Sequence, residues 1–508
     1  MEAVKLNQDN LARIGTPVLI PAYKRDGVKP GIVHLGLGHF HRAHQALYLE
    51  ILLNKGITRA GLFEINLIKD PFPLAKIAGE QDYLYTLLTK SKDGAESVQI
   101  VGSIRGYINA SENIAPAIAR IAGAEISVVT MTITEKGYYW DAALGDLDWN
   151  AGALVHDLTH PAEPQSAAGV IAAALKLRYD AGGLPLSILS CDNFAANGKV
   201  LRSSVLSFCR RVYPEIASWV EDKISFPCSM VDRITPNTAA ETIRYLEKQY
   251  GIVDTWAVCC EDYLQWVLED SFSLPPNAAF DPRCYAEAGV QLVKDVEPYE
   301  LMKQGLLNGS HSALAYLAYL LGYADVAAAM EDSDLRSFIR SSYMEEVTPT
   351  LLPVEGIDLS NYKDTLINRF SNRNIGDTIL RLAEDGSKKI PLFILKPLTR
   401  AVHAGKPCGA LILALSGWAR FLDGTDENGK PIPIKDPDGV SVIAAAQKAR
   451  ENPGAFLRAA GVQGLNENDL ARLEENFKSY LEQIWRQGTR NTLLEFLRHR
   501  EKNAGSRP

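Results

Sequence analysis

A short stretch in the second half of the chain, "MKQGLLNGSHSAL" (Met302 to Leu314), carries three residues that could do acid–base chemistry. Lys303, Asn308 and His311 stand among small and apolar residues, in a segment with the periodicity of a buried helix. Burial disfavours the charged ammonium and lowers the pKa of a lysine, which suits it to act as a general base. An asparagine amide can donate a hydrogen bond to a developing alkoxide. The alternative is a lysine that reaches solvent and an asparagine that caps a turn beside Gly309.

The spacing allows these side chains to share one face. At about 100° per residue of an α-helix, the three residues and Glu300 fall within one arc of about 140°. Glu300 lies one turn before Lys303 and could pass a proton to solvent; an unchanged pH–rate profile in Glu300→Gln would contradict that relay. Asn193, in "LSCDNFAANG", is a second amide donor just beyond the end of a predicted strand. A base with two amide donors suits the oxidation of a secondary alcohol, which loses a proton from oxygen and a hydride from carbon.

A glycine turn near the N-terminus, "HLGLGHFHRAHQ", predicts where the hydride acceptor binds. Gly36 and Gly38 follow a predicted strand and precede a predicted helix, so the backbone could approach a pyrophosphate closely. His41 occupies the third glycine position of G-x-G-x-x-G, and an ordinary glycine turn is the alternative. We predict that a dinucleotide contacts Leu35, Gly36, Leu37, Gly38, His39, Phe40 and Arg42.

An acidic residue after the second predicted strand bears on the choice between NAD and NADP. Glu64 falls inside that strand, whereas Asp70 lies just past its carboxyl end. A carboxylate there hydrogen-bonds a ribose 2′-hydroxyl and repels a 2′-phosphate. Lys69 would weaken the repulsion. We therefore predict that NAD is preferred.

Three histidines in "HFHRAH", His39, His41 and His44, raise the question of a metal site. Zinc needs three or four converging ligands. A glycine turn that runs into a helix would point these rings in different directions. We predict contacts at the start of a helix and no metal.

The pattern along the chain predicts two domains, since 508 residues are too many for one hydrophobic core. Short β-rich runs alternate with helical patterns in the first half, which favours an α/β, Rossmann-type doubly wound domain over residues 1–295. Long apolar-periodic segments then predict a mostly α-helical substrate-binding domain over residues 296–508. The expected strands are 31–35, 60–68, 97–104, 126–134 and 184–191, and a helix is expected over 42–56.

Composition limits the partners. The net charge of −8 and the pI near 5.7 give no general attraction to nucleic acid or anionic lipid. The N-terminus lacks a basic region followed by an apolar run, and no apolar stretch reaches about 18 residues. The seven cysteines form no CxxC pair, as expected of reduced thiols. We expect a cytoplasmic protein with a small-molecule substrate.

Several blocks together resemble the polyol-specific long-chain dehydrogenase/reductase family over nearly the whole chain. These blocks are "GIVHLGLGHFHRAHQA", "TITEKGYY", "SCDNFAANG", "FPCSMVDRITP", "PYELMKQGLLNGSHSALAYL" and "DTILRLAEDGSKKIP". The resemblance implies a monomer that oxidises D-mannitol to D-fructose with NAD and without a metal. One departure is His39, which replaces a glycine of the family's pattern.

The resemblance also implies roles for individual residues. Lys303 matches the family's base, Asn193 and Asn308 match its oxyanion hole, and His311 matches a contact to the reacting oxygen or its neighbour. Asp232, Arg381 and Lys389 match positions that bind the other hydroxyls of the substrate. The alternative is that these three residues are surface charges or form ion pairs. Glu135, after a predicted strand, is expected near the nicotinamide without an assigned role.

Two other functions stay open. A relative acting on D-arabinitol, sorbitol or a hexuronate (fructuronate or tagaturonate) differs only in substrate, and Arg381 or Lys389 could meet a terminal carboxylate. A dinucleotide-binding regulator without catalysis would have no use for the base, the two amide donors and the histidine.

Overall fold

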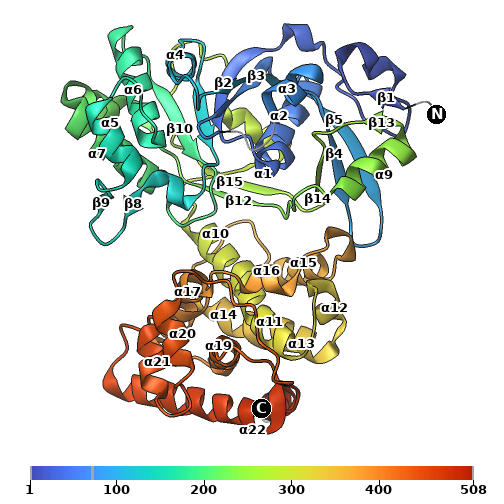
Figure 1. Ribbon diagram of the computed structural model, residues 1–508, viewed down its shortest axis with the longest axis vertical. Coiled ribbons are helices and arrows are strands. Elements are labelled where there is room, and N and C mark those ends of the chain that lie inside the picture. The colour runs from blue at the N-terminus through green and yellow to red at the C-terminus, as the bar shows by residue number, and fades with distance from the viewer. Residues whose placement is uncertain (1–2, 70–73, 506–508) are drawn as a thin grey trace. The chain divides into compact units, whose positions relative to one another are not determined.

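The computed structural model describes residues 3–69 and 74–505 (Figure 1). The chain divides into two compact units, Met1–Glu297 and Pro298–Pro508. Strands and helices alternate in the first unit, whereas the described part of the second is built of helices and loops.

A six-stranded parallel sheet forms the centre of the first unit, with the strand order β11-β10-β7-β2-β3-β6. Its strands are β2 Lys29–Leu35, β3 Ala60–Asn66, β6 Ile104–Asn109, β7 Val128–Met131, β10 Leu186–Ser190 and β11 Ile224–Ser225. The chain starts at the centre with β2, adds β3 and β6 on one side, and then returns to add β7, β10 and β11 on the other. The order therefore reverses between β2 and β7, where doubly wound sheets bind ligands at the carboxyl ends of their strands. The predicted Rossmann-type fold is confirmed.

The other strands of this unit form small sheets. Two are three-stranded, β14-β4-β5 and β12-β15-β16, and β1–β13 and β8–β9 are pairs. Their bounds are β1 Val4–Lys5, β4 Tyr85–Lys90, β5 Glu96–Val101, β8 Trp140–Asp141, β9 Asp146–Leu147, β12 Ser229–Asp232, β13 Ile252–Val253, β14 Val258–Glu261, β15 Gln265–Glu269 and β16 Gln291–Val293.

Nine described helices accompany these sheets. They are α1 His39–Ala43, α2 Gln45–Asn54, α3 Leu74–Glu80, α4 Ala115–Ala122, α5 Gly152–Thr159, α6 Ala167–Asp180, α7 Asn197–Val212, α8 Ala217–Lys223 and α9 Ala240–Tyr250.

The central strand β2 is buried on both faces because successive side chains of a strand point to opposite sides. Val33 and Leu35 pack in one hydrophobic core with α4, α6 and α7. Ile32 packs in a second core with α2, β4, β14 and β15. Burial on both faces explains why the inner strands of this sheet have mostly apolar sequences.

Two expected elements are divided in the structure. The strand predicted over 97–104 covers nearly all of β5 and the first residue of β6, which belong to different sheets. The chain turns at Gly102, whose amide donates to the buried Glu50 carboxylate at 2.9 Å and whose carbonyl accepts from Arg25 at 3.2 Å. The helix predicted over 42–56 breaks at His44, where φ is −125° and ψ is −88°.

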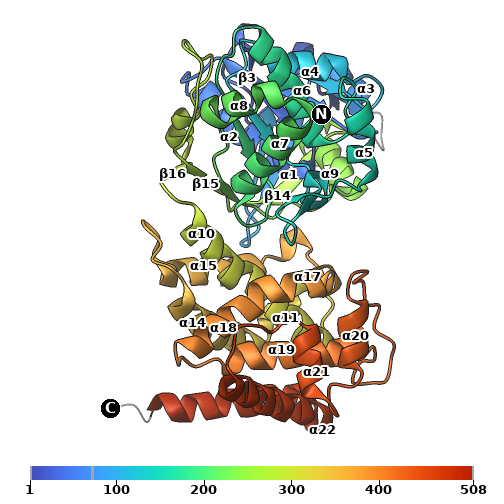
Figure 2. The same cartoon turned by 90° about the vertical axis from the view of Figure 1, so that its left-hand side faces the viewer.

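The second unit is a bundle in which α11 Gly309–Leu320 packs against α19 Gly409–Leu422. Figure 2 shows α22 Glu467–Gly505 running along the bundle past α19 and α21. A non-helical residue, Gly488 (φ 84°, ψ 161°), kinks α22. The other helices are α10 Glu297–Met302, α12 Val326–Glu331, α13 Ser333–Ser337, α14 Met344–Val347, α15 Leu359–Phe370, α16 Ile379–Ala383, α17 Gly386–Ile390, α18 Lys396–His403, α20 Val440–Ala446 and α21 Pro453–Ala459.

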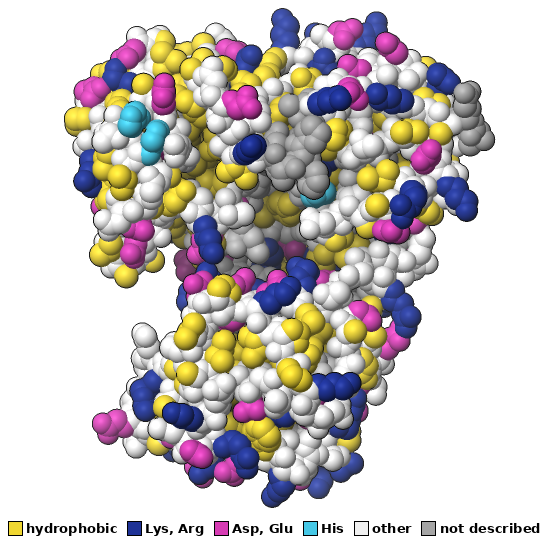
Figure 3. Space-filling view, in the orientation of Figure 1, with side chains coloured by type: hydrophobic (Ala, Val, Ile, Leu, Met, Phe, Trp, Pro, Cys, Tyr) yellow, Lys and Arg dark blue, Asp and Glu magenta, His cyan; other side chains and the backbone are white. Residues whose placement is uncertain are grey.

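Basic and acidic side chains are interspersed on the face that Figure 3 shows. This face therefore provides no extended field of one sign to steer a polyanion. Within residues 3–69 and 74–505, no helix has the length and hydrophobicity needed to cross a bilayer.

Candidate active site

The glycine turn lies at the switch point of the sheet. Gly36 follows β2 with φ at +107°, and its amide donates to the carbonyl of Ile65 at 2.9 Å. A Cβ on Gly36 would overlap the carbonyl of Thr132, just past the end of β7. Gly38, by contrast, is exposed, and a Cβ there would meet no atom of residues 3–69 and 74–505 within 4 Å. The turn thus fits between two strands on one side and leaves open space on the other, which suits the approach of a pyrophosphate.

The structure places the remaining predicted cofactor residues differently from one another. His39 and Phe40 are partly exposed at the start of α1, whereas Leu35 and Leu37 are buried. Arg42 is only 3% exposed, and its guanidinium donates to the carbonyl of Trp256 and lies 4.6 Å from the centre of that ring. The guanidinium of Arg42 is therefore engaged in contacts within the first unit, and its predicted contact with the dinucleotide stays a prediction. Asp70, the predicted ribose-binding acid, lies outside the described residues.

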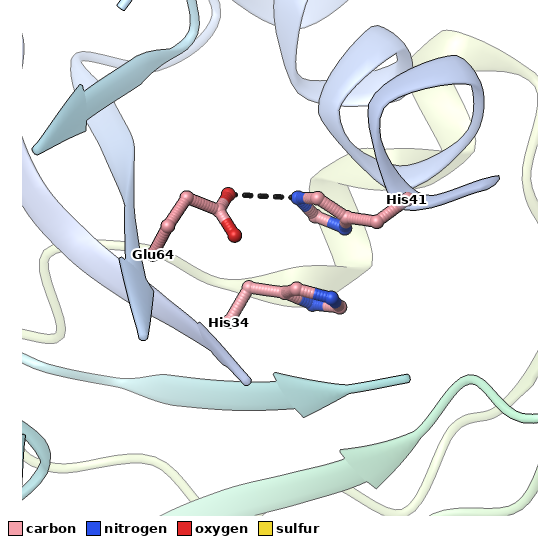
Figure 4. A group of neighbouring side chains, drawn as sticks. All are labelled: His34, His41 and Glu64. Carbon is pink, nitrogen blue, oxygen red and sulfur yellow. Dashed lines mark hydrogen bonds and ion pairs between the residues drawn. The ribbon is translucent and has the colours of Figure 1, made fainter. Parts of the chain in front are cut away.

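Beneath the glycine turn, His34, His41 and Glu64 form a completely buried polar cluster (Figure 4). His41 Nε2 lies 2.8 Å from Glu64 Oε1, and the His34 and His41 rings stack with centroids 3.4 Å apart and an interplanar angle of 15°. The lone pairs of ring nitrogens lie in the ring planes, so two nearly parallel rings do not converge on one tetrahedral metal. Of the three histidines considered from the sequence, only His41 belongs to this group. His34 was missed because an apolar strand surrounds it, and its position two residues before Gly36 was the available signal.

The Glu64 carboxyl gives this cluster a predictable pH dependence. Burial raises its pKa from 4.5 to about 7. The folded protein therefore binds the proton more tightly than the unfolded chain, and stability falls as pH rises from about 4.5 to about 7. We expect the free energy of unfolding of Glu64→Gln, relative to the natural protein, to increase by about 3 kcal/mol between pH 4.5 and pH 8. Urea denaturation of both proteins across that range measures the difference, and parallel pH curves would contradict the assignment.

Lys303 lies on a π-helical turn, Lys303–Asn308, between α10 and α11. Its side chain is buried, with 5% exposure, while Asn308 and His311 are partly exposed. A π turn adds one residue to the helix and shifts every later side chain by about 100°. The expectation of a regular α-helix is therefore wrong. The correction narrows the arc shared with Glu300 from about 140° to roughly 80°.

Two further π-helical turns support this segment. They are Phe338–Tyr343 and Pro391–Leu395. The Tyr343 hydroxyl donates to the carbonyl of Phe393 at 3.2 Å. A Cβ on Gly309, the residue after the first π turn, would overlap the Tyr343 hydroxyl and lie 2.8 Å from the Phe393 carbonyl. The three turns meet at Gly309, which fixes the start of α11.

Arg381 and Lys389 lie on short helices that pack against α11. Arg381, on α16, is exposed and forms an ion pair with Asp377, whose hydrogen bonds raise the pKa of Arg381. Lys389, on α17, donates to the carbonyl of Leu382 at 3.2 Å, and burial lowers its pKa. Both helices contact α11, which carries His311. The second unit thus carries Lys303 and Asn308 on the π turn, His311 on α11, and Arg381 and Lys389 on two helices that contact α11.

Asn193, Asp232 and Glu135 belong to the first unit. Asn193 is exposed in the loop after β10, and Asp232 ends β12 with 5% exposure. Glu135 begins a short 3-10 turn, Glu135–Tyr138, in the loop after β7.

The sheet order and the glycine turn define the first unit as a Rossmann-type dinucleotide-binding domain, and a helical domain follows it. The family model described as the mannitol dehydrogenase Rossmann domain matches residues 30–278, and the model of the mannitol dehydrogenase C-terminal domain matches residues 295–485. The chain belongs to the mannitol dehydrogenase family. The predicted family resemblance is confirmed.

Relatives match over nearly the whole chain. A mannitol 2-dehydrogenase of Phaeosphaeria nodorum is 37% identical over 499 residues, covering 97% of this chain and 86% of the relative. The structure of Pseudomonas fluorescens mannitol 2-dehydrogenase, a ternary complex with NAD and D-mannitol, is 36% identical with a TM-score of 0.84 and covers 97% of this chain and 100% of that one. A substrate-free D-sorbitol dehydrogenase is 32% identical with a TM-score of 0.87, covering 96% and 100%.

Proposed function

We propose that this protein is an NAD-dependent oxidoreductase that converts D-mannitol to D-fructose, reversibly and without a metal. The observation that carries the proposal is its match, over 97% of the chain, to a mannitol 2-dehydrogenase whose structure holds NAD and D-mannitol. The open space at Gly38 and the switch point beside β2 suit the dinucleotide.

Lys303 is the proposed general base. It removes the proton from the reacting hydroxyl, and the amides of Asn193 and Asn308 donate hydrogen bonds to the oxygen as negative charge develops. NAD, when bound, accepts the hydride that leaves the same carbon. His311 is proposed to contact the reacting oxygen or its neighbour, and Glu300 to pass the proton onward.

Asp232, Arg381 and Lys389 are proposed to bind the remaining hydroxyls. A polyol offers several donors and acceptors, and a site built to hydrogen-bond them rejects analogues that leave buried polar groups unpaired. The existing ion pair of Arg381 with Asp377 weighs against recognition of a hexuronate carboxylate by Arg381. The monomeric state and cytoplasmic location stay predictions.

A second candidate is oxidation of another polyol, since the D-sorbitol dehydrogenase has a TM-score of 0.87 against 0.84 for the mannitol enzyme. Initial rates of NADH formation with D-mannitol, D-sorbitol and D-arabinitol distinguish the two. We expect kcat/KM to be at least about tenfold higher for D-mannitol, equivalent to about 1.4 kcal/mol of transition-state binding.

The reverse reaction and the choice of coenzyme complete this test. Fructose should be reduced faster than fructuronate or tagaturonate, and NADH should be used in preference to NADPH. A preference for sorbitol or for a hexuronate would overturn the choice of substrate. Dinucleotide binding without turnover of any of these compounds would instead favour a regulator.

A further inference from the structure

One carboxylate joins two loops that carry proposed site residues. Asp192, 9% exposed, directly precedes Asn193 in the loop after β10. Its Oδ1 accepts from the amide of Thr134 at 2.9 Å, and its Oδ2 accepts from the amide of Ile133 at 3.1 Å. Oδ2 also accepts from the hydroxyl of Tyr138 at 2.7 Å. The loop after β7, which carries Glu135, is thus tied to the loop that carries Asn193.

The backbone on both sides of this link is strained. Thr134 has φ 65° and ψ 155°, a region that is essentially restricted to glycine. Tyr139 and Ala196 adopt left-handed conformations with φ values of 49° and 53°. Non-glycine residues keep such conformations only where the surroundings hold them. The Asp192 carboxylate accepts the amide of Thr134, the residue with the most unusual of these conformations.

A second side chain extends the connection to the strand that carries Asp232. The Asn197 amide donates to the carbonyl of Asp192 at 2.9 Å and to that of Ser229 at 2.8 Å, and its oxygen accepts from the Ser229 amide at 3.0 Å. Ser229 is the first residue of β12, which ends at Asp232. The loops after β7 and β10 and the strand β12 therefore form one hydrogen-bonded assembly.

We propose that Asp192 is a positioning residue that fixes the Asn193 amide relative to Glu135 by accepting the amides of Ile133 and Thr134. The proposal rests on the proposed role of Asn193 as a donor to the developing alkoxide. Asp192 itself acts through its neighbours and needs no contact with substrate or cofactor. A donor used mainly in the transition state affects kcat and kcat/KM together.

The test compares kcat, KM and NADH affinity in Asp192→Asn and the natural protein. An asparagine offers one acceptor oxygen, so its NH₂ group would face one of the two backbone amides, donor against donor. We expect kcat and kcat/KM to fall about 30-fold at unchanged KM, with the Kd of NADH within threefold. Tyr138→Phe removes one of the three hydrogen bonds and keeps both backbone contacts, so kcat should fall less than threefold.

Asp157 provides a matched control, because it is also a buried carboxylate that accepts from two backbone amides and a hydroxyl; its Oδ1 lies 3.3 Å from His156 Nδ1 as well. It accepts from the amides of Gln165 and Ser166 and from the Ser166 hydroxyl. The segments that it joins contain none of the proposed site residues. Asp157→Asn should lower the urea midpoint as Asp192→Asn does and leave kcat within twofold. If Asp192→Asn had the kcat of the natural protein, or if Asp157→Asn lost as much kcat as Asp192→Asn, the positioning role would be overturned. Failure of the proposed function looks different, since the natural protein would then oxidise no polyol.

Discussion

Lys303→Met is expected to lower kcat for D-mannitol by about 1,000-fold, within the range of about 10² to 10⁴ that general bases contribute. Methionine is similar in length and apolar, so it fits a site where lysine is 5% exposed. The variant should therefore fold and bind NADH with nearly natural affinity, because the side chain is proposed to act on the hydroxyl proton. Initial rates and a fluorescence titration with NADH measure the two quantities.

Lys363 supplies the control for this substitution, because it is also 5% exposed and lies in the same unit. Its Nζ lies 2.6 Å from a carboxylate oxygen of Glu345, and neither residue is a proposed site residue. Lys363→Met should reduce stability and leave kcat within about threefold. Lys303→Ala should also regain part of its activity when methylamine is added, because a free amine can replace the missing base. Natural turnover in Lys303→Met would remove the assigned role.

Gly36→Ala should destabilise the first unit by roughly 3 to 5 kcal/mol, because two costs combine. Its φ of +107° is unfavourable for alanine, and the new Cβ would overlap the Thr132 carbonyl, which is backbone and cannot rotate away. Urea denaturation measures the loss, and NADH affinity should fall with it.

Gly38→Ala separates folding from cofactor binding at the same turn. Its backbone φ of −97° suits alanine, and its Cβ would meet no atom of the described chain within 4 Å. Stability should change by less than about 1 kcal/mol, whereas NADH affinity should fall at least tenfold because the methyl group occupies the space proposed for the pyrophosphate. Unchanged NADH affinity in Gly38→Ala would contradict this placement of the dinucleotide.

Four strands of the central sheet, β2, β3, β7 and β10, could be predicted from the sequence because they are largely buried and so leave a nearly unbroken apolar signal. The edge strands β6 and β11 are only partly buried and carry no such signal. The turn between β5 and β6 and the break between α1 and α2 could not be predicted. The turn at Gly102 depends on Glu50 and Arg25, and the break at His44 accompanies a contact between its ring and the Gln265 carbonyl at 2.8 Å. These partners are distant in the chain, so local patterns carry no trace of them.

The candidate site shows the same division. The apolar neighbours of Lys303 predicted a buried helix but left open a lysine that reaches solvent, and the structure shows that Lys303 is buried, with 5% exposure. The π turn was not, because Tyr343 and Phe393 help to hold it from other helices. The hydrogen bond from the Thr134 amide to Asp192 could not be predicted either, since backbone amides have no sequence signature. The roles of the site residues stay predictions that the substitutions above test.

The packing around Gly309 has a consequence for how this enzyme could diversify. The lysine-bearing segment packs at Gly309 against Tyr343 and Phe393 of two other π turns, so its register tolerates little change. Arg381 and Lys389 instead occupy helices of five residues each, and Arg381 is exposed. We expect new sugar preferences to arise by changes in those two short helices, while the segment that carries the proposed base stays unchanged.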